Sequence, residues 1–169
     1  MVNAWAMAGG KMAVYTGLIQ KLKPTNDELA QVIGHEIAHA LARHSAEKMS
    51  VAAATQAGVA AVSGMMGDNQ VAMTGTTLLA AVAVTLPNSR TMESEADRIG
   101  IELAARAGYN PQAAVSLWRK MAQVGGKNPP QFLSTHPNPS TREETLRQLA
   151  PRMMPYYEAK GQRPSFPLK

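Results

Sequence analysis

A histidine, a glutamate and a second histidine stand together in the stretch HEIAH, residues 35–39. His35 and His39 are four positions apart, so a helix places both rings on one face, where both can bind one metal ion. Glu36 points to a neighbouring angle and is free to take a proton from a metal-bound water. The spacing is typical of zinc peptidases, in which Zn²⁺ lowers the pKa of that water toward ~7. The alternative is a chance match on an amphipathic helix.

A third histidine, His44, does not fit this ligand set. The metzincin pattern HExxHxxGxxH has one residue more between its second and third histidines, and Ala42 stands here where that pattern has glycine. If the helix continues through His44, at about 100° per residue its ring points roughly opposite to that of His35. We therefore predict a surface or packing role for His44, and a third ligand must come from elsewhere.

Acidic residues downstream offer that ligand, in the stretch SRTMESEADRIG of residues 89–100. On a helix, Glu93 and Asp97 share a face, whereas Glu95 lies about 200° round from Glu93. If Glu93 bound the metal, Asp97 would lie one turn along and could accept the N–H of a metal-bound imidazole. The alternative is a solvent-exposed acidic helix start stabilised by the helix dipole. Together with the upstream HEIAH, the metal interpretation is favoured.

Two helices are needed to present these residues, and the sequence predicts both. Thr25 and Glu28 form a capping box, and apolar residues recur with helical period from there, in a helix that we expect to reach about Ala57. The acidic residues lie on a second predicted helix, residues 88–107, which Gly108 ends.

Composition favours helices elsewhere too, because apolar residues make up 45% of the chain and aromatic residues only 5%. Local start signals predict three further elements: a small β-hairpin around Gly9-Gly10, a helix from Asn110-Pro111, and a last helix that opens with capping boxes at Ser140 and Thr141 and ends near Leu149. We expect one domain over residues 1–150 and an extended, proline-rich tail over residues 151–169.

Charge and apolar runs limit the other classes of function. The 169-residue chain has a formal net charge of +5 with scattered basic residues, which predicts a solvated surface and no nucleic-acid partner. It has no cysteine, which excludes disulfides and thiolate metal sites. Residues 51–86 are nearly free of charge, but each of their two apolar runs is shorter than the roughly 20 residues of a membrane span. We expect two helices there, or a helix and a mobile loop.

Four stretches in this order resemble the gluzincin peptidase family that contains the heat-shock protease HtpX and the CAAX prenyl proteases. They are NAWAMAGGKMAVYTGL, HEIAH, SRTMESEAD and STHPNPSTR, and together they cover about residues 3–142. The resemblance implies a zincin-like metallopeptidase domain, mainly α with a small β-element (α+β), and one catalytic Zn²⁺. It implies His35, His39 and Glu93 as zinc ligands, Glu36 as general base and Asp97 as support for a ligand.

The last of these stretches adds two residues to the expected site. His136 corresponds to a histidine that precedes a proline in the family, and we expect it near the zinc, where it stabilises the oxyanion of the intermediate or caps the metal in a resting state. Arg142 corresponds to the following arginine, and we expect it to orient the loop or to bind substrate.

Within this family the chain is most similar to the soluble periplasmic branch of BepA-like and LoiP-like proteases. That similarity implies a metalloendopeptidase of bacterial envelope quality control, periplasmic or membrane-associated, acting on unfolded or misassembled proteins. We find no secretory signal peptide and expect a truncated chain whose export signal lies outside it. Contact with a membrane surface and the oligomeric state stay open. The alternative is a zinc-containing, chaperone-like binder of unfolded proteins with little proteolysis.

Overall fold

The structure, a computed structural model, describes residues 1–7, 9–66, 89–124, 136 and 141–160. Along the chain follow β1 (Ala4–Ala6), β2 (Met12–Val14), α1 (Thr16–Leu22), α2 (Asn26–Leu41), α3 (His44–Met66), a helical segment over residues 89–106, α5 (Ala113–Val124) and α7 (Arg142–Ala159). The prediction of a mainly helical domain with a small β-hairpin is confirmed.

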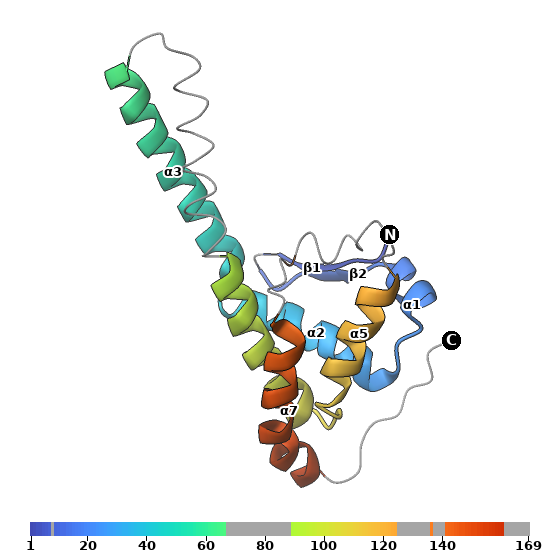
Figure 1. The fold of residues 1–169 in the computed structure, drawn as a ribbon. Coiled ribbons are helices and arrows are strands. Elements are labelled where there is room, and N and C mark those ends of the chain that lie inside the picture. The colour runs from blue at the N-terminus through green and yellow to red at the C-terminus, as the bar shows by residue number, and fades with distance from the viewer. Residues whose placement is uncertain (8, 67–88, 125–135, 137–140, 161–169) are drawn as a thin grey trace.

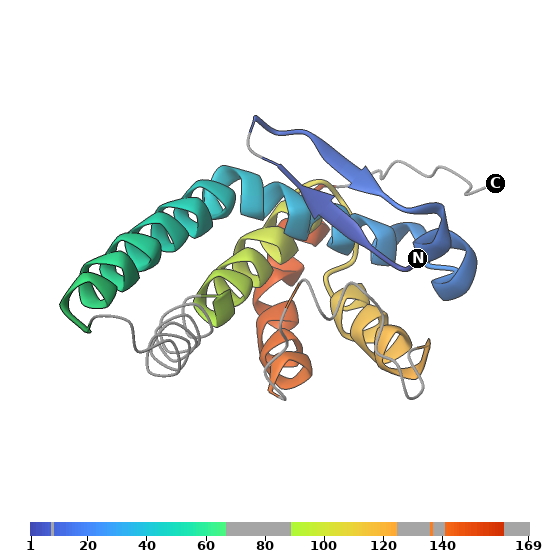
Figure 2. The same ribbon diagram turned by 90° about the horizontal axis from the view of Figure 1, so that it is seen from above.

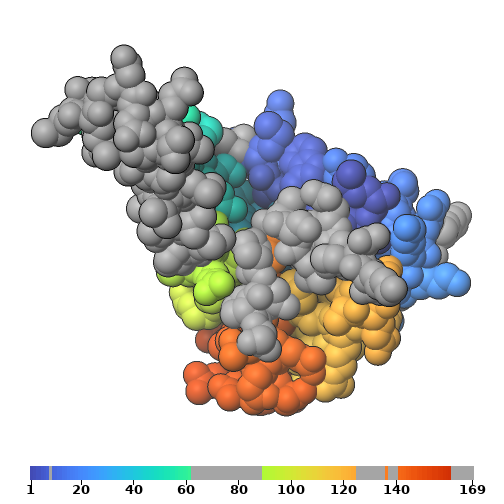
Figure 3. All heavy atoms as spheres, turned by 45° about the horizontal axis from the view of Figure 1, so that its top comes forward, coloured from blue at the N-terminus to red at the C-terminus, as the bar shows by residue number. Residues whose placement is uncertain are grey.

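Helix α2 crosses the middle of the molecule and organises the rest. The hairpin lies along one side of α2, and α3 extends away from the body (Figure 1). The helical segment 89–106, α7 and α5 fan out from the other side of α2 (Figure 2). In the space-filling view, the hairpin and α1 (blue) lie above α5 and α7 (orange) (Figure 3). The main apolar core lies between these layers and includes Leu18, Val32, Ile101, Leu117, Trp118, Met121 and Leu146.

The predicted hairpin is confirmed and lies against the HEIAH helix. The chain turns where Gly9 and Gly10 have φ angles of +87° and +76°, a region that glycine reaches without steric cost. The strands pair antiparallel with Trp5 opposite Ala13. Ala4 is fully buried, because β1 packs on α2.

Helix α2 begins as predicted but ends earlier. The Thr25 hydroxyl accepts from the backbone N–H of Glu28 at 3.2 Å, and the Glu28 carboxylate accepts from the N–H of Thr25 at 2.9 Å. The helix stops at Leu41, Arg43 adopts a left-handed φ of +56°, and α3 starts at His44. The prediction of one helix to about Ala57 is therefore wrong. The sequence gives no sign of this break, because neither glycine nor proline stands there.

The helical segment 89–106 crosses α2 where neither helix has a side chain. A Cβ on Gly34 would lie 2.6 Å from the carbonyl oxygen of Gly100, and a Cβ on Gly100 would lie 2.7 Å from the amide nitrogen of His35. Only glycine permits this approach, and it brings the acidic residues of the segment against His35. The predicted helix is confirmed over residues 89–106, and Gly108 has the positive φ expected beyond its end.

Helix α7 extends further than the sequence predicts. It runs to Ala159 across Pro151 and Pro155, although each proline removes a backbone donor. The guanidinium of Arg106 lies 3.9 Å from the ring centroid of Tyr156, a cation–π contact to the second half of α7. The prediction of an extended tail is therefore wrong as far as residue 159. The domain boundary at residue 150 stays a prediction, and α7 crosses it.

Other local predictions have mixed outcomes. The amide oxygen of Asn110 accepts from the N–H of Gln112 at 2.9 Å, and α5 starts one residue later, close to the predicted start. The Thr141 side chain makes no capping hydrogen bond, so that predicted box is wrong, and Ser140 lies outside the described residues. Residues 67–88, with the second apolar run, also lie outside them. Within the described parts of the chain, no helix combines the length and apolar character that crossing a membrane requires.

Candidate metal centre

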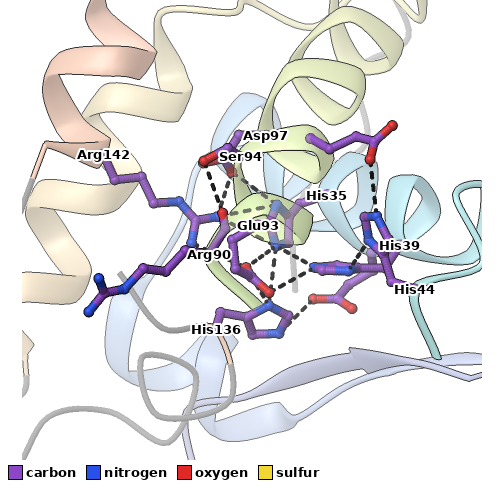
Figure 4. Close-up of polar contacts among 11 residues, drawn as sticks. His35, His39, His44, Arg90, Glu93, Ser94, Asp97, His136 and Arg142 are labelled. Carbon is purple, nitrogen blue, oxygen red and sulfur yellow. Dashed lines mark hydrogen bonds and ion pairs between the residues drawn. The ribbon is translucent and has the colours of Figure 1, made fainter. Parts of the chain in front are cut away.

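Four buried side chains bring their donor atoms together between α2 and the helical segment 89–106. His35 and His39 come from α2, Glu93 comes from the helical segment 89–106, and His136 comes from between α5 and α7 in the chain (Figure 4). One donor atom from each lies within 4.8 Å of the others. The structure thus brings together the three expected ligands and the expected histidine from the last motif.

The spacing of these donors fits a metal ion better than it fits hydrogen bonds among them. Nε2 of His35 lies 3.0 Å from Nε2 of His39, 3.1 Å from Oε2 of Glu93 and 3.2 Å from Nδ1 of His136. A ring nitrogen carries one proton at most, so it cannot donate to three acceptors at once. Tetrahedral ligands about 2.0–2.1 Å from a zinc ion lie roughly 3.3 Å from one another. Oε1 of Glu93 is buried and makes no hydrogen bond of good geometry among the described residues, although Nε2 of His39 lies 3.3 Å away, as suits an oxygen that turns toward a cation.

Burial and hydrogen bonding shift the pKa values of these donors in different directions. Burial is the largest cause for His39 and lowers its pKa to about 4, which leaves the ring neutral near pH 7. Burial raises the pKa of Glu93, but close contacts with the ring nitrogens of the three histidines outweigh it and hold the pKa far below its ordinary value. Burial lowers the pKa of His35, but hydrogen bonds to Asp97 and Glu93 have the larger effect, so the pKa lies above its ordinary value. A bound cation would take the place of the proton on His35.

Glu36, the expected general base, lies beside the donor group. Its Oε1 is 3.4 Å from Nε2 of His136, and the residue is only 1% exposed. Burial raises its pKa more than the nearby positive charges lower it, which makes the carboxylate a better proton acceptor. A cavity of about 130 Å³ adjoins Glu36 and His136 and is also lined by Trp5 of β1 and Lys48 of α3. The cavity therefore lies next to Glu36, between the hairpin and α3.

Asp97 and Arg142 lie together behind His35. Oδ1 of Asp97 is 3.0 Å from Nδ1 of His35 and accepts from Nη2 of Arg142 at 2.5 Å. Nη1 of Arg142 donates to Oε2 of Glu93 at 3.3 Å, and its guanidinium lies 3.9 Å from the ring centroid of Trp118. Arg142 is thus buried behind the donor group, and only 3% of it is exposed.

His44 lies closer to the centre than its sequence position predicts. It is only 2% exposed, its Nδ1 is 2.8 Å from Nδ1 of His39, and its Nε2 is 3.4 Å from Oε2 of Glu95. Because α2 breaks at Arg43, the ring does not point away as on a continuous helix. It packs against His39 and lies outside the four-donor group. A backbone φ at an arginine leaves no mark in the sequence, so this contact could not be anticipated.

Fold and site together define the class of this protein as a mainly helical HExxH metallopeptidase domain. The particular family follows from sequence comparison. The sequence model of peptidase family M48 matches residues 1–150, and the chain belongs to this family.

Curated relatives of known type agree with this assignment. The chain is 38% identical to the mitochondrial metalloendopeptidase OMA1 of Arabidopsis thaliana, over 88% of this chain and 29% of that protein. It is 33% identical to OMA1 of Saccharomyces cerevisiae, over 92% and 46% of the two chains. It is 34% identical to the β-barrel assembly-enhancing protease of Yersinia pestis, over 95% and 35%. The chain spans less than half the length of these relatives, and the family predicted from the motifs is confirmed.

Proposed function

We propose that the chain is a zinc-dependent metalloendopeptidase in which His35, His39 and Glu93 hold the ion. The observation that carries this proposal is the convergence of three buried donors from two crossing helices on one point beside Glu36. Two imidazoles and one carboxylate are a ligand set of catalytic zinc sites, which keep a further position for water or substrate. Membership of a peptidase family and similarity to metalloendopeptidases support the same reaction.

Glu36 is the residue to which we assign the proton transfers. A zinc ion held by the three ligands supplies Lewis acidity, which acidifies water and polarises a peptide carbonyl. Glu36 takes the proton from the attacking water and later delivers it to the leaving amine. Its buried position and raised pKa suit this role, because a carboxylate with a raised pKa accepts a proton more readily.

Asp97 and Arg142 are assigned to ordering the ligands. Asp97 accepts the Nδ1–H of His35, which keeps Nε2 free of a proton and turned toward the ion. Arg142 holds the carboxylates of both Asp97 and Glu93 in place. We therefore favour an orienting role for Arg142 over a role in binding substrate.

His136 is proposed to act beside the zinc ion, at the position where the carbonyl of a substrate has to bind. Its Nδ1 lies 3.0 Å from Oε2 of Glu93 among the donors, while its Nε2 faces Glu36. This position supports a cap over the ion in a resting state, and a donor to the oxyanion when the carbonyl enters. Replacing His136 by alanine should lower kcat and leave the zinc content unchanged. Loss of zinc from that variant would instead make His136 a required ligand.

Unfolded or misassembled proteins of the bacterial envelope are the proposed substrates, in the periplasm or at a membrane surface. The similarity to β-barrel assembly-enhancing proteases supports this assignment. The similarity to mitochondrial enzymes makes the compartment a separate question, and fractionation of cells that produce the full-length protein answers it.

Metal analysis combined with casein cleavage tests the proposed reaction. Wild type and Glu36→Gln should each bind one zinc per chain, and cleavage by the variant should fall by about 10²–10⁴-fold. The glutamine is close in size to the glutamate, so the fold and the metal site remain. Zinc binding with no Glu36-dependent cleavage would contradict the enzyme and favour a chaperone-like binder of unfolded proteins.

A further inference from the structure

The outer nitrogen of His39 faces another histidine. Nε2 of His39 points into the donor group, 3.0 Å from Nε2 of His35 and 3.3 Å from Oε1 of Glu93. Nδ1 of the same ring points the other way and lies 2.8 Å from Nδ1 of His44 (Figure 4). A hydrogen bond between these two nitrogens needs one of them to donate and the other to accept.

The proposed zinc ligation decides which nitrogen donates. An imidazole that binds a metal through Nε2 carries its proton on Nδ1. Nδ1 of His39 must then donate, and Nδ1 of His44 must accept. The proton of His44 is therefore on Nε2, which lies 3.4 Å from the carboxylate oxygen Oε2 of Glu95. Each ring is left with one possible tautomer.

We propose that His44 is a positioning residue for the zinc ligand His39, fixing its ring orientation and tautomer by accepting the Nδ1–H. The chain of hydrogen bonds runs from His39 through His44 to Glu95. This inference rests on the proposed zinc site and adds a residue that the HExxH motif does not contain.

The backbone between the two histidines supports this role. On an unbroken helix, a residue five positions after His39 lies roughly 140° round the axis and cannot touch its ring. The left-handed φ of +56° at Arg43 ends α2 and starts α3 at a new angle, which turns His44 back onto His39. A positive φ is unfavourable for a residue with a side chain. At Arg43 this unfavourable φ places the buried imidazole of His44 behind a donor.

Two substitutions of His44 separate hydrogen bonding from packing. His44→Asn keeps an acceptor oxygen close to the place of Nδ1, whereas His44→Leu fills the space without an acceptor. In the full chain, we expect His44→Leu to weaken zinc affinity about 10-fold, measured by competition with a chelator. His44→Asn should recover most of that loss. The absorption spectrum of the Co²⁺-substituted protein should change for the leucine variant and resemble wild type for the asparagine variant.

Leu18→Ala is the matched control for packing. Leu18 lies on α1, is fully buried in the apolar core, and is not one of the residues that contact the four donors. This variant should lower the melting temperature of the metal-free protein and leave zinc affinity within about 2-fold of wild type. A larger loss of zinc affinity would show that a packing defect far from the donors also weakens zinc binding. If His44→Leu does not fold, His44→Met replaces it.

The outcomes distinguish this inference from the proposed function. A wild type that binds no zinc contradicts the proposed function itself. A wild type that binds zinc while His44→Leu binds it equally well contradicts only the role of His44. Equal affinities of the leucine and asparagine variants, both weaker than wild type, would also overturn the inference, because the acceptor would then not matter.

Discussion

The two proposed histidine ligands are supported from behind in different ways. Nδ1 of His35 faces the buried carboxylate of Asp97, which Arg142 contacts at 2.5 Å. Nδ1 of His39 faces Nδ1 of His44, and a charge appears only one residue further out, on the carboxylate of Glu95, whose side chain is 48% exposed. One side uses buried charges, and the other uses a chain of hydrogen bonds that ends in solvent.

This difference predicts that substitutions of the supporting residues have unequal effects, although both sets of residues orient a histidine. Removing one member of a buried ion pair leaves the other charge without a partner in a medium of low dielectric constant. Removing a link of an uncharged chain costs only the unmade hydrogen bond of one polar group. Substitutions behind His35 should therefore have larger effects than substitutions behind His39.

The largest effect is expected from Arg142→Met. Asp97 and Glu93 would both lose their buried cation, so the free energy of unfolding of the metal-free protein should fall by about 3–5 kcal/mol. Urea unfolding in the presence of a chelator measures it. Arg147→Met is the matched control, because Arg147 pairs with Glu143 and Glu144 on the exposed face of the same helix and should cost less than about 1 kcal/mol. Equal losses would show that the buried pair contributes no more than a surface pair.

Glu28 belongs to a charge pair that lies away from the four donors. It tests whether such a pair affects the stability of the fold without affecting zinc affinity. Its buried carboxylate meets Lys120 at 2.5 Å and Ser116 at 2.7 Å, which ties α2 to α5. Glu28→Gln should lower the free energy of unfolding by about 1.5–3 kcal/mol at pH 7. Zinc affinity should not change.

The pH dependence of this effect follows from the pKa of Glu28. Burial raises that pKa, but hydrogen bonds from Lys120, Thr25 and Ser116 outweigh it and hold the pKa below the ordinary 4.5. The stabilisation is therefore complete above about pH 4.5 and is lost as the pH falls through the lower pKa of the folded state. Urea unfolding of wild type and Glu28→Gln should give stabilities that approach each other in acid. A difference that grows in acid would contradict the assignment.

Asp97→Asn measures the support behind His35 directly. Asparagine can still accept the Nδ1–H of His35, but it lacks the charge that raises the basicity of the ring. We expect zinc affinity to fall by about 100-fold, the upper part of the usual range for such residues. Chelator competition checks this against the weaker effect expected for His44→Leu. An Asp97→Asn variant that binds zinc as well as wild type would remove the distinction between the two sides.

The parts of this centre that sequence alone predicted are those with local signals. The capping box at Thr25 and the four-residue spacing of His35 and His39 specify a helix and a face. The helical period from Glu93 to Asp97 places a proposed ligand and its proposed support on one side. The position of His136 came only from resemblance to a family, since a histidine in a proline-rich stretch has no spacing relation to HEIAH.

The parts that sequence did not predict depend on long-range packing. The break at Arg43 has no glycine or proline to announce it, and it is kept by contacts that His44 makes after the chain has folded. The burial of Arg142 depends on Trp118 and Asp97, from two other helical segments. Helix α7 continues across Pro151 because Ala150 is fully buried and Leu146 belongs to the core. Local propensity favours the opposite in each of these places.

The smallest effect is expected from Glu95→Gln, at the outer end of the His39 side. Its contact with His44 is long, at 3.4 Å, and the carboxylate is half-exposed, so water and salt screen it. Zinc affinity should fall by less than about 3-fold at low salt, and the difference should disappear at about 1 M salt, where the screening length is short. The effect of Asp97→Asn should persist there, because that carboxylate is buried. A large or salt-independent loss in Glu95→Gln would show that both sides of the centre depend on charge to the same degree.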